Sequence, residues 1–349
     1  MREFSVALVS WQRAHGRSSL PWQNTRDPYR VWLSEIMLQQ TQVSTVLDYY
    51  ARFLARFPDV ASLAAADADA VLGLWSGLGY YSRARNLHRC AQEVMALHGG
   101  VFPSSAEVLQ TLPGIGRSTA AAIASFGFDE RVAILDGNVK RVLTRLLGFS
   151  DDLSQAKAER ALWSLASELL PGHSDMPAYT QGLMDLGATL CTTRKPQCLI
   201  CPVQRLCQAL QRGEPEAFPV KTRKLKRSAQ ALWLLRAERV DDGAVWLERR
   251  PASGIWGGLY CLPVYDDEAA LLEALPSSAR AKAAHGPGFV HVLTHKDLHL
   301  KPVTARFSGA DQPGLGLAAS EPLASAWFLP AQWAVLGLPA PVRKLLEAG

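Results

Sequence analysis

The sequence lacks the features of a membrane or exported protein. None of its apolar runs approaches the roughly 18 to 20 residues that span a bilayer. Residues 1–12 show no basic start followed by an apolar core and a small-residue cleavage site. We therefore expect a cytoplasmic protein without a membrane partner.

Cysteine is scarce outside one cluster. Four of the six cysteines fall within residues 191–207, which is not the spread of a secreted disulfide framework. Four thiolates at the spacing C-x6-C-x2-C-x5-C can hold a [4Fe-4S] cluster or a tetrahedral zinc ion, and the ligand type alone does not choose. The pattern predicts a metal site in a reducing compartment, with these ligands: Cys191, Cys198, Cys201 and Cys207.

Charge gives only a weak indication of the partner. A net charge of +5 over 349 residues is compatible with a polyanion such as nucleic acid. The basic run 221–227 follows several glycines and prolines. We interpret it as a solvated linker in preference to a phosphate clamp.

The length favours two domains, each with its own core. Up to about residue 210 the sequence predicts helices, the clearest beginning with Asp27 as N-cap and Pro28 as first helical residue. Apolar residues at helical spacing continue from Trp32 to Leu54, until Pro58 ends the run.

After Cys207 the predicted secondary structure changes from helices to strands. Strands are predicted at 231–236 and 244–249 around the turn Asp241-Asp242-Gly243, then at 289–293 and 298–307, with a closing helix that ends at Leu346. The predicted fold is an all-α domain (1–212), a basic linker (213–229) and an α+β domain (230–349).

A glycine-bearing turn, Leu112-Pro113-Gly114-Ile115-Gly116-Arg117-Ser118-Thr119-Ala120, joins two predicted helices over about 110–125. Without side chains at Gly114 and Gly116, backbone N–H groups can approach a DNA phosphate without reading base sequence. An ordinary helix-helix turn is the alternative.

About twenty residues later comes Ile134-Leu135-Asp136-Gly137-Asn138-Val139-Lys140-Arg141. The pair resembles the helix-hairpin-helix motif and Gly/Pro-Asp element of the endonuclease III superfamily. The resemblance implies that Asp136 faces the deoxyribose of an extruded nucleotide, while its structural alternative is an N-cap, and it can serve as both.

Bifunctional members of that superfamily carry a lysine in the hairpin helix that attacks the sugar. Ser118 stands at this position. With no amine to form a Schiff base, we expect a monofunctional DNA glycosylase whose own acid helps the base to leave.

Glu35 is the candidate acid, because apolar neighbours would raise the pKa of its carboxyl. Composition alone favours a glutamate on a solvent-facing helix surface. The segments 20–42 and 77–87, however, resemble the MutY family of adenine DNA glycosylases, and the likeness continues to Cys207. The resemblance implies that Glu35 protonates adenine at N7 and that Asp136 stabilises the sugar cation.

Further positions follow from this resemblance. Residues that match the adenine pocket are Trp22, Gln23, Leu38 and Gln181. Residues that match contacts to the duplex or to an opposing 8-oxoguanine are Gln40, Thr41, Leu78 and Tyr80. Asn138 matches an asparagine beside the catalytic aspartate. An extruded base leaves a gap that planar or apolar side chains fill, although such residues are ordinarily core.

The resemblance also favours a [4Fe-4S] cluster over zinc in the 191–207 loop, with a structural and DNA-docking role. Residues 249–263 resemble the MutT-like (Nudix) domain that ends MutY proteins, but residues 264–290 contain no glutamate-rich Mg²⁺ box, so this domain should bind and not hydrolyse. Where the family has a Phe-Ser-His loop that probes 8-oxoguanine, this chain has Leu293-Thr294-His295. Thr294 and His295 are the predicted lesion contacts, and a simple hairpin turn is the alternative.

Altogether the sequence predicts a monomeric glycosylase that removes adenine opposite 8-oxoguanine or guanine in duplex DNA, without a nucleotide cofactor, and associated with the nucleoid through DNA. A thymine or uracil mismatch glycosylase is one rival, which Glu35 and the MutT-like domain disfavour. A catalytically silent DNA-binding module is another, which the pairing of Glu35 with Asp136 disfavours.

Overall fold

The computed structural model describes residues 2–222, 226–308, 311–314 and 325–348. These residues form two compact units. The first contains residues up to 64 and from 89 to 224, and the second contains residues 65–88 and those from 225 onward. The described part of the chain has no helix long and apolar enough to cross a membrane.

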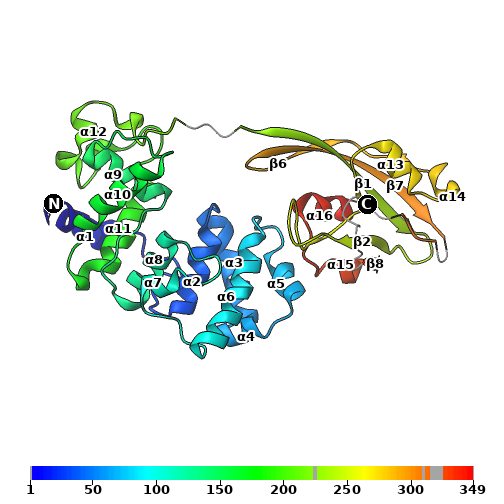
Figure 1. The fold of residues 1–349 in the computed structure, drawn as a ribbon, viewed down its shortest axis with the longest axis horizontal. Coiled ribbons are helices and arrows are strands. Elements are labelled where there is room, and N and C mark those ends of the chain that lie inside the picture. Colours follow the sequence, from blue (N-terminus) through cyan, green and yellow to red (C-terminus); the bar gives the residue numbers. More distant parts are fainter. Residues whose placement is uncertain (1, 223–225, 309–310, 315–324, 349) are drawn as a thin grey trace. The chain divides into compact units, whose positions relative to one another are not determined.

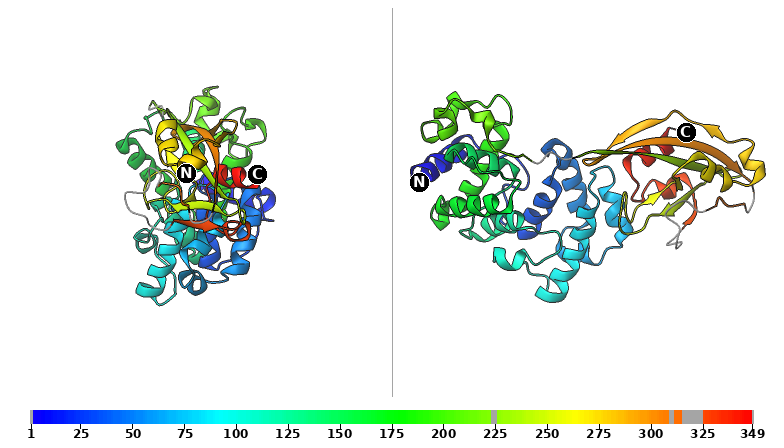
Figure 2. Two further views of the ribbon diagram at one scale, coloured as in Figure 1. Left: turned by 90° about the vertical axis from the view of Figure 1, so that its right-hand side faces the viewer. Right: turned by 45° about the horizontal axis from the view of Figure 1, so that its top comes forward.

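The first unit is helical (Figures 1 and 2). Its longer helices, with α6 shared between the units, are α1 (Arg2–His15), α2 (Pro28–Leu38), α3 (Val43–Arg56), α6 (Ser82–His98), α8 (Arg117–Phe128), α9 (Gly137–Leu147), α10 (Ala156–Glu168) and α11 (Met176–Thr189). Short helical segments are α4 (Val60–Ala64), α7 (Ala106–Leu109), α12 (Gln208–Gln211) and four 3-10 turns, η1 (His173–Asp175), η2 (Cys198–Ile200), η3 (Gln204–Leu206) and η4 (Pro215–Ala217).

The start of α2 agrees with the sequence prediction. The Asp27 carboxylate accepts a hydrogen bond from the Tyr29 amide, and Pro28 is the first helical residue. The single run predicted up to Pro58 is wrong, because α2 ends at Leu38 and α3 begins at Val43. Gln40 lies between them with φ +57°, in the left-handed region, where an α-helix cannot continue. Apolar spacing persists across this break and so concealed it.

The core of the helical unit packs the helices that carry the predicted site residues against one another. Helix α8 packs against α2, α7 and α11, and α9 packs against α10, α11 and α12. Fully buried apolar side chains fill this centre, among them Leu8, Val139, Leu143, Leu162 and Met176. The segment that carries Asp136 is therefore anchored to this buried core.

The second unit is built on a mixed sheet. Its strands are β1 (Ser228–Arg239), β2 (Val245–Arg249), β3 (Tyr260–Cys261), β4 (Val264–Tyr265), β5 (Ala284–His285), β6 (Phe289–Val292), β7 (Lys296–Phe307) and β8 (Ser325–Phe328). The long strands β1 and β7 pair in parallel over their whole length, and β6 returns antiparallel onto β7 (Figure 1). Four strands were predicted near their observed positions; β3, β4 and β5, of two residues each, are too short to show a periodicity, and β8 was not predicted.

Alternating side chains of β1 serve two apolar cores. Leu232 and Leu234 pack with residues of α15 (Pro330–Trp333) and α16 (Ala340–Glu347), whereas Leu235 packs with residues of α13 (Glu268–Glu273) and α14 (Ser277–Arg280). Successive side chains of a strand point to opposite faces, so apolar residues on both faces of β1 are buried because each face of the sheet is covered.

This second unit also contains residues 65–88, which include α5 (Ala68–Trp75). The sequence division at 213–229 did not anticipate that a segment so early in the chain belongs with the C-terminal sheet. Residues 223–225 of the predicted linker lie outside the described residues.

Candidate active site and DNA interface

The hairpin between α7 and α8 has the backbone of an anion-binding turn. Gly114 has φ +76°, in the left-handed region that favours glycine. Gly116 is the N-cap of α8, no side chain of a described residue caps this helix, and a Cβ at Gly116 would meet nothing within 4 Å. The uncapped N–H groups of the α8 N-terminus can therefore receive a phosphate.

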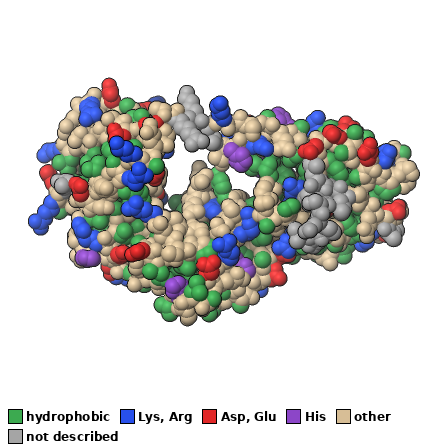
Figure 3. Space-filling model, viewed as in Figure 1, with side chains coloured by type: hydrophobic (Ala, Val, Ile, Leu, Met, Phe, Trp, Pro, Cys, Tyr) green, Lys and Arg blue, Asp and Glu red, His purple; other side chains and the backbone are tan. Residues whose placement is uncertain are grey.

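Lys and Arg side chains also lie on the helical unit, in the part that carries α9 and α10 (Figure 3). Arg117 at the start of α8 stacks over Trp163, its guanidinium carbon 4.0 Å from the ring centroid. Such charges add attraction for the phosphate backbone that does not depend on sequence.

Ser118 connects the hairpin helix to the segment before Asp136. Its Oγ accepts a hydrogen bond of 3.1 Å from the Leu135 amide. A short hydroxyl of the hairpin helix thus fixes the backbone that carries the aspartate.

Asp136 is the N-cap of α9. Its Oδ1 accepts a hydrogen bond of 2.7 Å from the Val139 amide. Burial raises the pKa of the carboxyl, while hydrogen bonds from the Val139 and Asn138 amides and the nearby charges of Arg141 and Lys140 lower it; burial has the larger effect. The capping bond holds one oxygen in place, as the N-cap interpretation required.

Asn138 is fixed by a residue that the sequence reasoning missed. Its Oδ1 accepts a 2.8 Å hydrogen bond from Arg141 Nη2, which also donates to the Gly187 carbonyl at 2.6 Å. Arg141 Nε donates to the Cys191 carbonyl at 2.7 Å. A Cβ at Gly187 would lie 2.7 Å from Asn138 Cβ, so glycine is required for α11 to approach α9. An arginine at i+3 from Asn138 was the only available signal.

Glu35 lies on a helix that is buried nearly all round. Its neighbours Val31, Trp32 and Ile36 are each at most 2% exposed, and Glu35 itself is half-buried and lines a cavity, so it does not lie on an open solvent-facing surface. Burial, and secondarily the charge of Asp136, raise the pKa of Glu35 to about 8. Its carboxyl is therefore protonated near neutral pH and can donate a proton.

A cavity of about 330 Å³ opens beside Glu35. It has the size of a small-molecule pocket. All four residues predicted to line an adenine pocket do line it: Trp22, Gln23, Leu38 and Gln181.

Trp22 is 8% exposed and packs edge-on against Tyr50 at 5.2 Å. Gln23 Nε2 is buried and has no hydrogen-bond partner among the described residues. An acceptor nitrogen of a planar base in the cavity would satisfy this donor.

The sequence reasoning missed Asp185, which organises the rim of this cavity. Its side chain is 1% exposed and accepts a hydrogen bond of 2.7 Å from Arg17 Nε and one of 2.8 Å from Gln181 Nε2. The Arg17 amide also donates to it at 2.9 Å. A buried carboxylate thereby orients two pocket side chains. Its position at i+4 from Gln181 was its only sequence signal.

Gln40 and Thr41 lie in the break between α2 and α3. Gln40 is exposed with a left-handed backbone, and the Thr41 amide donates to the Leu38 carbonyl at 3.2 Å. The neighbouring Gln39 Nε2 donates to Thr119 Oγ1 of α8 at 3.3 Å. The turn between α2 and α3 is therefore held beside α8, the second helix of the glycine-bearing hairpin.

The predicted lesion contacts meet in the second unit. Tyr80 is 44% exposed, and its hydroxyl lies 2.9 Å from Thr294 Oγ1. Leu78, by contrast, is only 6% exposed. Thr294 and His295 form the exposed turn between β6 and β7, where Arg227 pairs with Asp297 and donates to the Thr294 carbonyl at 3.1 Å.

The four clustered cysteines surround a small cavity of about 30 Å³. Arg145, only 2% exposed, lies beside it and donates to Cys191 Sγ at 3.3 Å and to the Thr192 carbonyl at 2.7 Å. Burial raises the pKa of the thiols of Cys198, Cys201 and Cys207, and their closeness to Cys191 adds to the shift. Among the described residues, no group of three or more His, Cys, Asp or Glu side chains converges on one ion position.

Comparison with known families assigns both parts of the chain. Residues 33–168 match the HhH-GPD superfamily of base excision DNA repair proteins, and residues 235–348 match the NUDIX domain. The sequence is 36% identical to the adenine DNA glycosylase of Buchnera aphidicola subsp. Acyrthosiphon pisum (strain APS), over 99% of this chain and 97% of that protein. It is 45% identical to the Mus musculus adenine DNA glycosylase over 62% of this chain and 44% of that protein.

Solved structures agree on the helical fold. A thermostable thymine-DNA glycosylase superposes with a TM-score of 0.54 at 29% identity, covering 60% of this chain and 95% of that one. Endonuclease III in a non-covalent DNA complex gives 0.50 at 20% identity, covering 60% and 96%, and shows the shared fold alone. With the near full-length match above, the chain belongs to the adenine DNA glycosylases, DNA-binding enzymes of base excision repair that act on adenine.

Proposed function

We propose that this enzyme is a monofunctional glycosylase that hydrolyses the N-glycosidic bond of adenine opposite 8-oxoguanine or guanine in duplex DNA. The observation that carries the chemistry is Glu35, an acid with a pKa of about 8 on the wall of a base-sized cavity. We propose that it acts in the cytoplasm, associated with the nucleoid through DNA.

The reaction needs two carboxyls in different states. Adenine leaves poorly as an anion, so Glu35 gives a proton to N7, and the electrons of the breaking C1′–N9 bond stay with the base. Asp136, held by the Val139 amide, faces the positive charge that develops on the sugar. Water then supplies hydroxyl to C1′, and its remaining proton returns to Glu35.

Strand cleavage is not expected to follow. Ser118 carries a hydroxyl that already accepts from the Leu135 amide, and a hydroxyl cannot form the Schiff base that precedes elimination. The product is therefore free adenine and an intact strand with an abasic site.

The proposed preference for 8-oxoguanine rests on the second unit. Tyr80 and Thr294 are in contact there and both are exposed, so they present an aromatic face and hydroxyls to an opposing base. Because Leu293 stands where the family has phenylalanine, Thr294 and His295 remain as the polar side chains that contact the opposing base.

We further propose that the 191–207 loop holds a [4Fe-4S] cluster. The support is the ligand set: four cysteines line one cavity beside a buried arginine, and such clusters take four thiolates. A cluster spreads its four ligands over several iron atoms, so the described side chains need not converge on one ion position. When bound, the cluster would fix the loop structurally, and hydrolysis needs no electron transfer. Iron analysis and visible absorption of the purified protein test this, and a colourless protein with stoichiometric zinc would contradict it.

Single-turnover assays on four duplexes test the main proposal: A opposite 8-oxoguanine, A opposite G, T opposite G and U opposite G, each with and without alkaline treatment. We expect adenine release only, fastest opposite 8-oxoguanine, with strand breaks only after alkali. Release of thymine but not adenine would favour a mismatch glycosylase, and no release at all would favour a silent DNA-binding module.

A further inference from the structure

The turn that carries Tyr80 has a strained backbone. Gly77 and Gly79 have φ of +99° and +75°, and Tyr80 itself has φ +48°. The left-handed region is unfavourable for a residue with a side chain, by about 1 kcal/mol or more. Such a conformation persists only where surrounding groups hold it.

One set of these groups comes from the neighbouring helices. Trp75 Nε1 donates to the Gly79 carbonyl at 3.0 Å, and Arg83 Nη2 donates to the same carbonyl at 3.2 Å. The Arg83 guanidinium also lies between the rings of Trp75 and Tyr80, 5.4 and 5.3 Å from their centroids. Trp75 and Arg83 thus hold the carbonyl of Gly79, and Arg83 also holds the ring of Tyr80.

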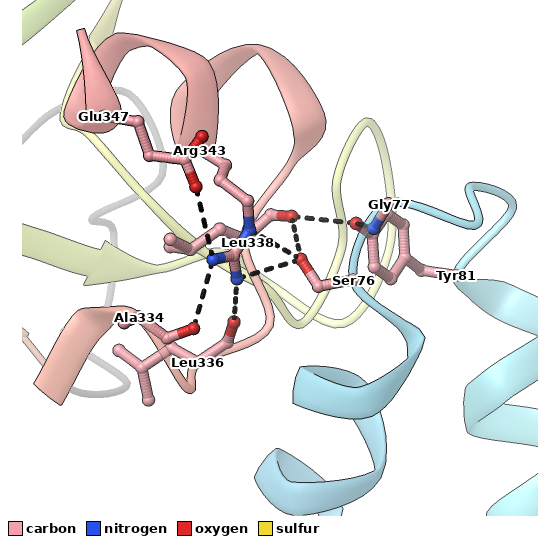
Figure 4. A network of polar contacts seen from close by, with 8 residues as sticks. All are labelled: Ser76, Gly77, Tyr81, Ala334, Leu336, Leu338, Arg343 and Glu347. Atoms are coloured by element: carbon pink, nitrogen blue, oxygen red, sulfur yellow. Dashed lines mark hydrogen bonds and ion pairs between the residues drawn. The ribbon is translucent and has the colours of Figure 1, made fainter. Parts of the chain in front are cut away.

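A second set comes from the end of the chain (Figure 4). The Leu338 carbonyl accepts from the Tyr81 hydroxyl at 2.8 Å and from Ser76 Oγ at 3.1 Å. The Tyr81 hydroxyl in turn accepts from the Gly77 amide at 3.2 Å. The Tyr81 hydroxyl thus donates to the 334–338 segment and accepts from the turn, and so links the two.

Arg343 of α16 completes this second set. Its Nη2 donates to Ser76 Oγ at 3.2 Å and to the Leu336 carbonyl at 3.0 Å, and its Nη1 donates to the Ala334 carbonyl at 3.1 Å. Glu347 approaches Nη1 at only 3.9 Å with a side chain 58% exposed, so it contributes little. Arg343 therefore joins the 334–338 segment to the start of the strained turn.

We propose that Ser76, Tyr81 and Arg343 are positioning residues that brace the 77–80 turn, so that Tyr80 meets the opposing base in one orientation. The C-terminal unit then contributes to discrimination twice, through the Thr294–His295 turn and through this brace. The inference rests on the proposed recognition of the opposing base by Tyr80.

A double-mutant cycle separates positioning from general stability. Tyr81→Phe keeps the ring and removes the bridging hydroxyl, and we expect it to lower the rate ratio for A opposite 8-oxoguanine over A opposite G by roughly fivefold, as for one or two lost hydrogen bonds. In a Tyr80→Ala background the same change should have no further effect. Arg343→Gln should behave like Tyr81→Phe, Arg343→Lys should restore part of the ratio, and Glu347→Gln is the matched control.

Hydrogen exchange of a peptide spanning 76–82 gives a readout that needs no DNA. Exchange should be faster in Tyr81→Phe and Arg343→Gln and unchanged in Glu347→Gln. The brace is wrong if exchange stays unchanged in both variants, or if Tyr81→Phe lowers the ratio equally in the Tyr80→Ala background. If the wild-type enzyme excises adenine equally fast opposite 8-oxoguanine and opposite G, the proposed mispair preference is wrong. Hydrogen exchange of the 76–82 peptide would still show whether Tyr81 and Arg343 hold the turn.

Discussion

The cavity beside Glu35 and the turn at Thr294 differ in how far they are exposed to solvent. The cavity is lined by residues of α2, α11 and the loop between α1 and α2, and burial itself changes the chemistry of its acid. The turn is exposed, and its Thr294 hydroxyl lies in hydrogen-bond contact with the hydroxyl of Tyr80. In the proposed mechanism, catalysis depends on removing water from the Glu35 carboxyl, whereas recognition of the opposing base depends on holding an exposed backbone in place.

The largest expected effect comes from Glu35→Gln. This variant keeps the shape of the cavity but removes the proton donor, so excision of adenine should slow by about 10²- to 10⁴-fold. Binding to an A opposite 8-oxoguanine duplex, measured by fluorescence anisotropy, should be retained. Glu107→Gln at an exposed site is the matched control and should excise normally. Equal rates for the two variants would remove Glu35 from the mechanism.

Asp136→Asn should follow with a loss of about 10²- to 10³-fold, because the charge that opposes the sugar cation is gone. Asparagine is itself a good N-cap, so the contact to the Val139 amide and the stability of α9 should survive. Single-turnover rates and a thermal melt check the two halves of this prediction. A lowered melting temperature with a proportional loss of activity would point to a capping role alone.

Changes in the recognition turn should be smaller and of a different kind. Thr294→Ala combined with His295→Ala should lower the preference for 8-oxoguanine over guanine by about fivefold and leave the rate on A opposite G nearly unchanged. Parallel time courses on the two duplexes measure this. If the ratio does not change, the turn is an ordinary hairpin and recognition lies elsewhere.

Stability should reveal the cost of burying Glu35. Because its folded pKa is about 8 and its ordinary value is 4.5, folding takes up a proton between these pH values. This group therefore opposes folding increasingly as pH rises from about 4.5 to 8, on the order of a few kcal/mol at most. Glu35→Gln should melt higher than wild type at pH 8.5, and the gap should close towards pH 5. A gap that is independent of pH would contradict the shift.

The sequence predicted best where a pattern has a local cause. The N-cap at Asp27, the hairpin at Gly114 and Gly116, and the N-cap at Asp136 depend on neighbours in the chain, and all three are observed. The break at Gln40 was missed because hydrophobic spacing carries no information about one left-handed residue.

Positions that depend on distant partners could not be predicted in the same way. Asp185 and Arg141 act through contacts to Arg17 and Cys191, which folding alone brings near. The membership of residues 65–88 in the C-terminal unit is likewise a tertiary fact. For Glu35 the composition favoured the wrong face of the helix, and only family resemblance indicated the buried one.

The pH dependence of single-turnover adenine release tests the central claim most directly. If protonated Glu35 is the acid, the rate on A opposite 8-oxoguanine should be constant through neutral pH and fall as pH rises through about 8, with a slope of one proton. The residual rate of Glu35→Gln should show no such fall. A wild-type rate that stays level to well above pH 8, or a fall that persists in Glu35→Gln, would contradict the account.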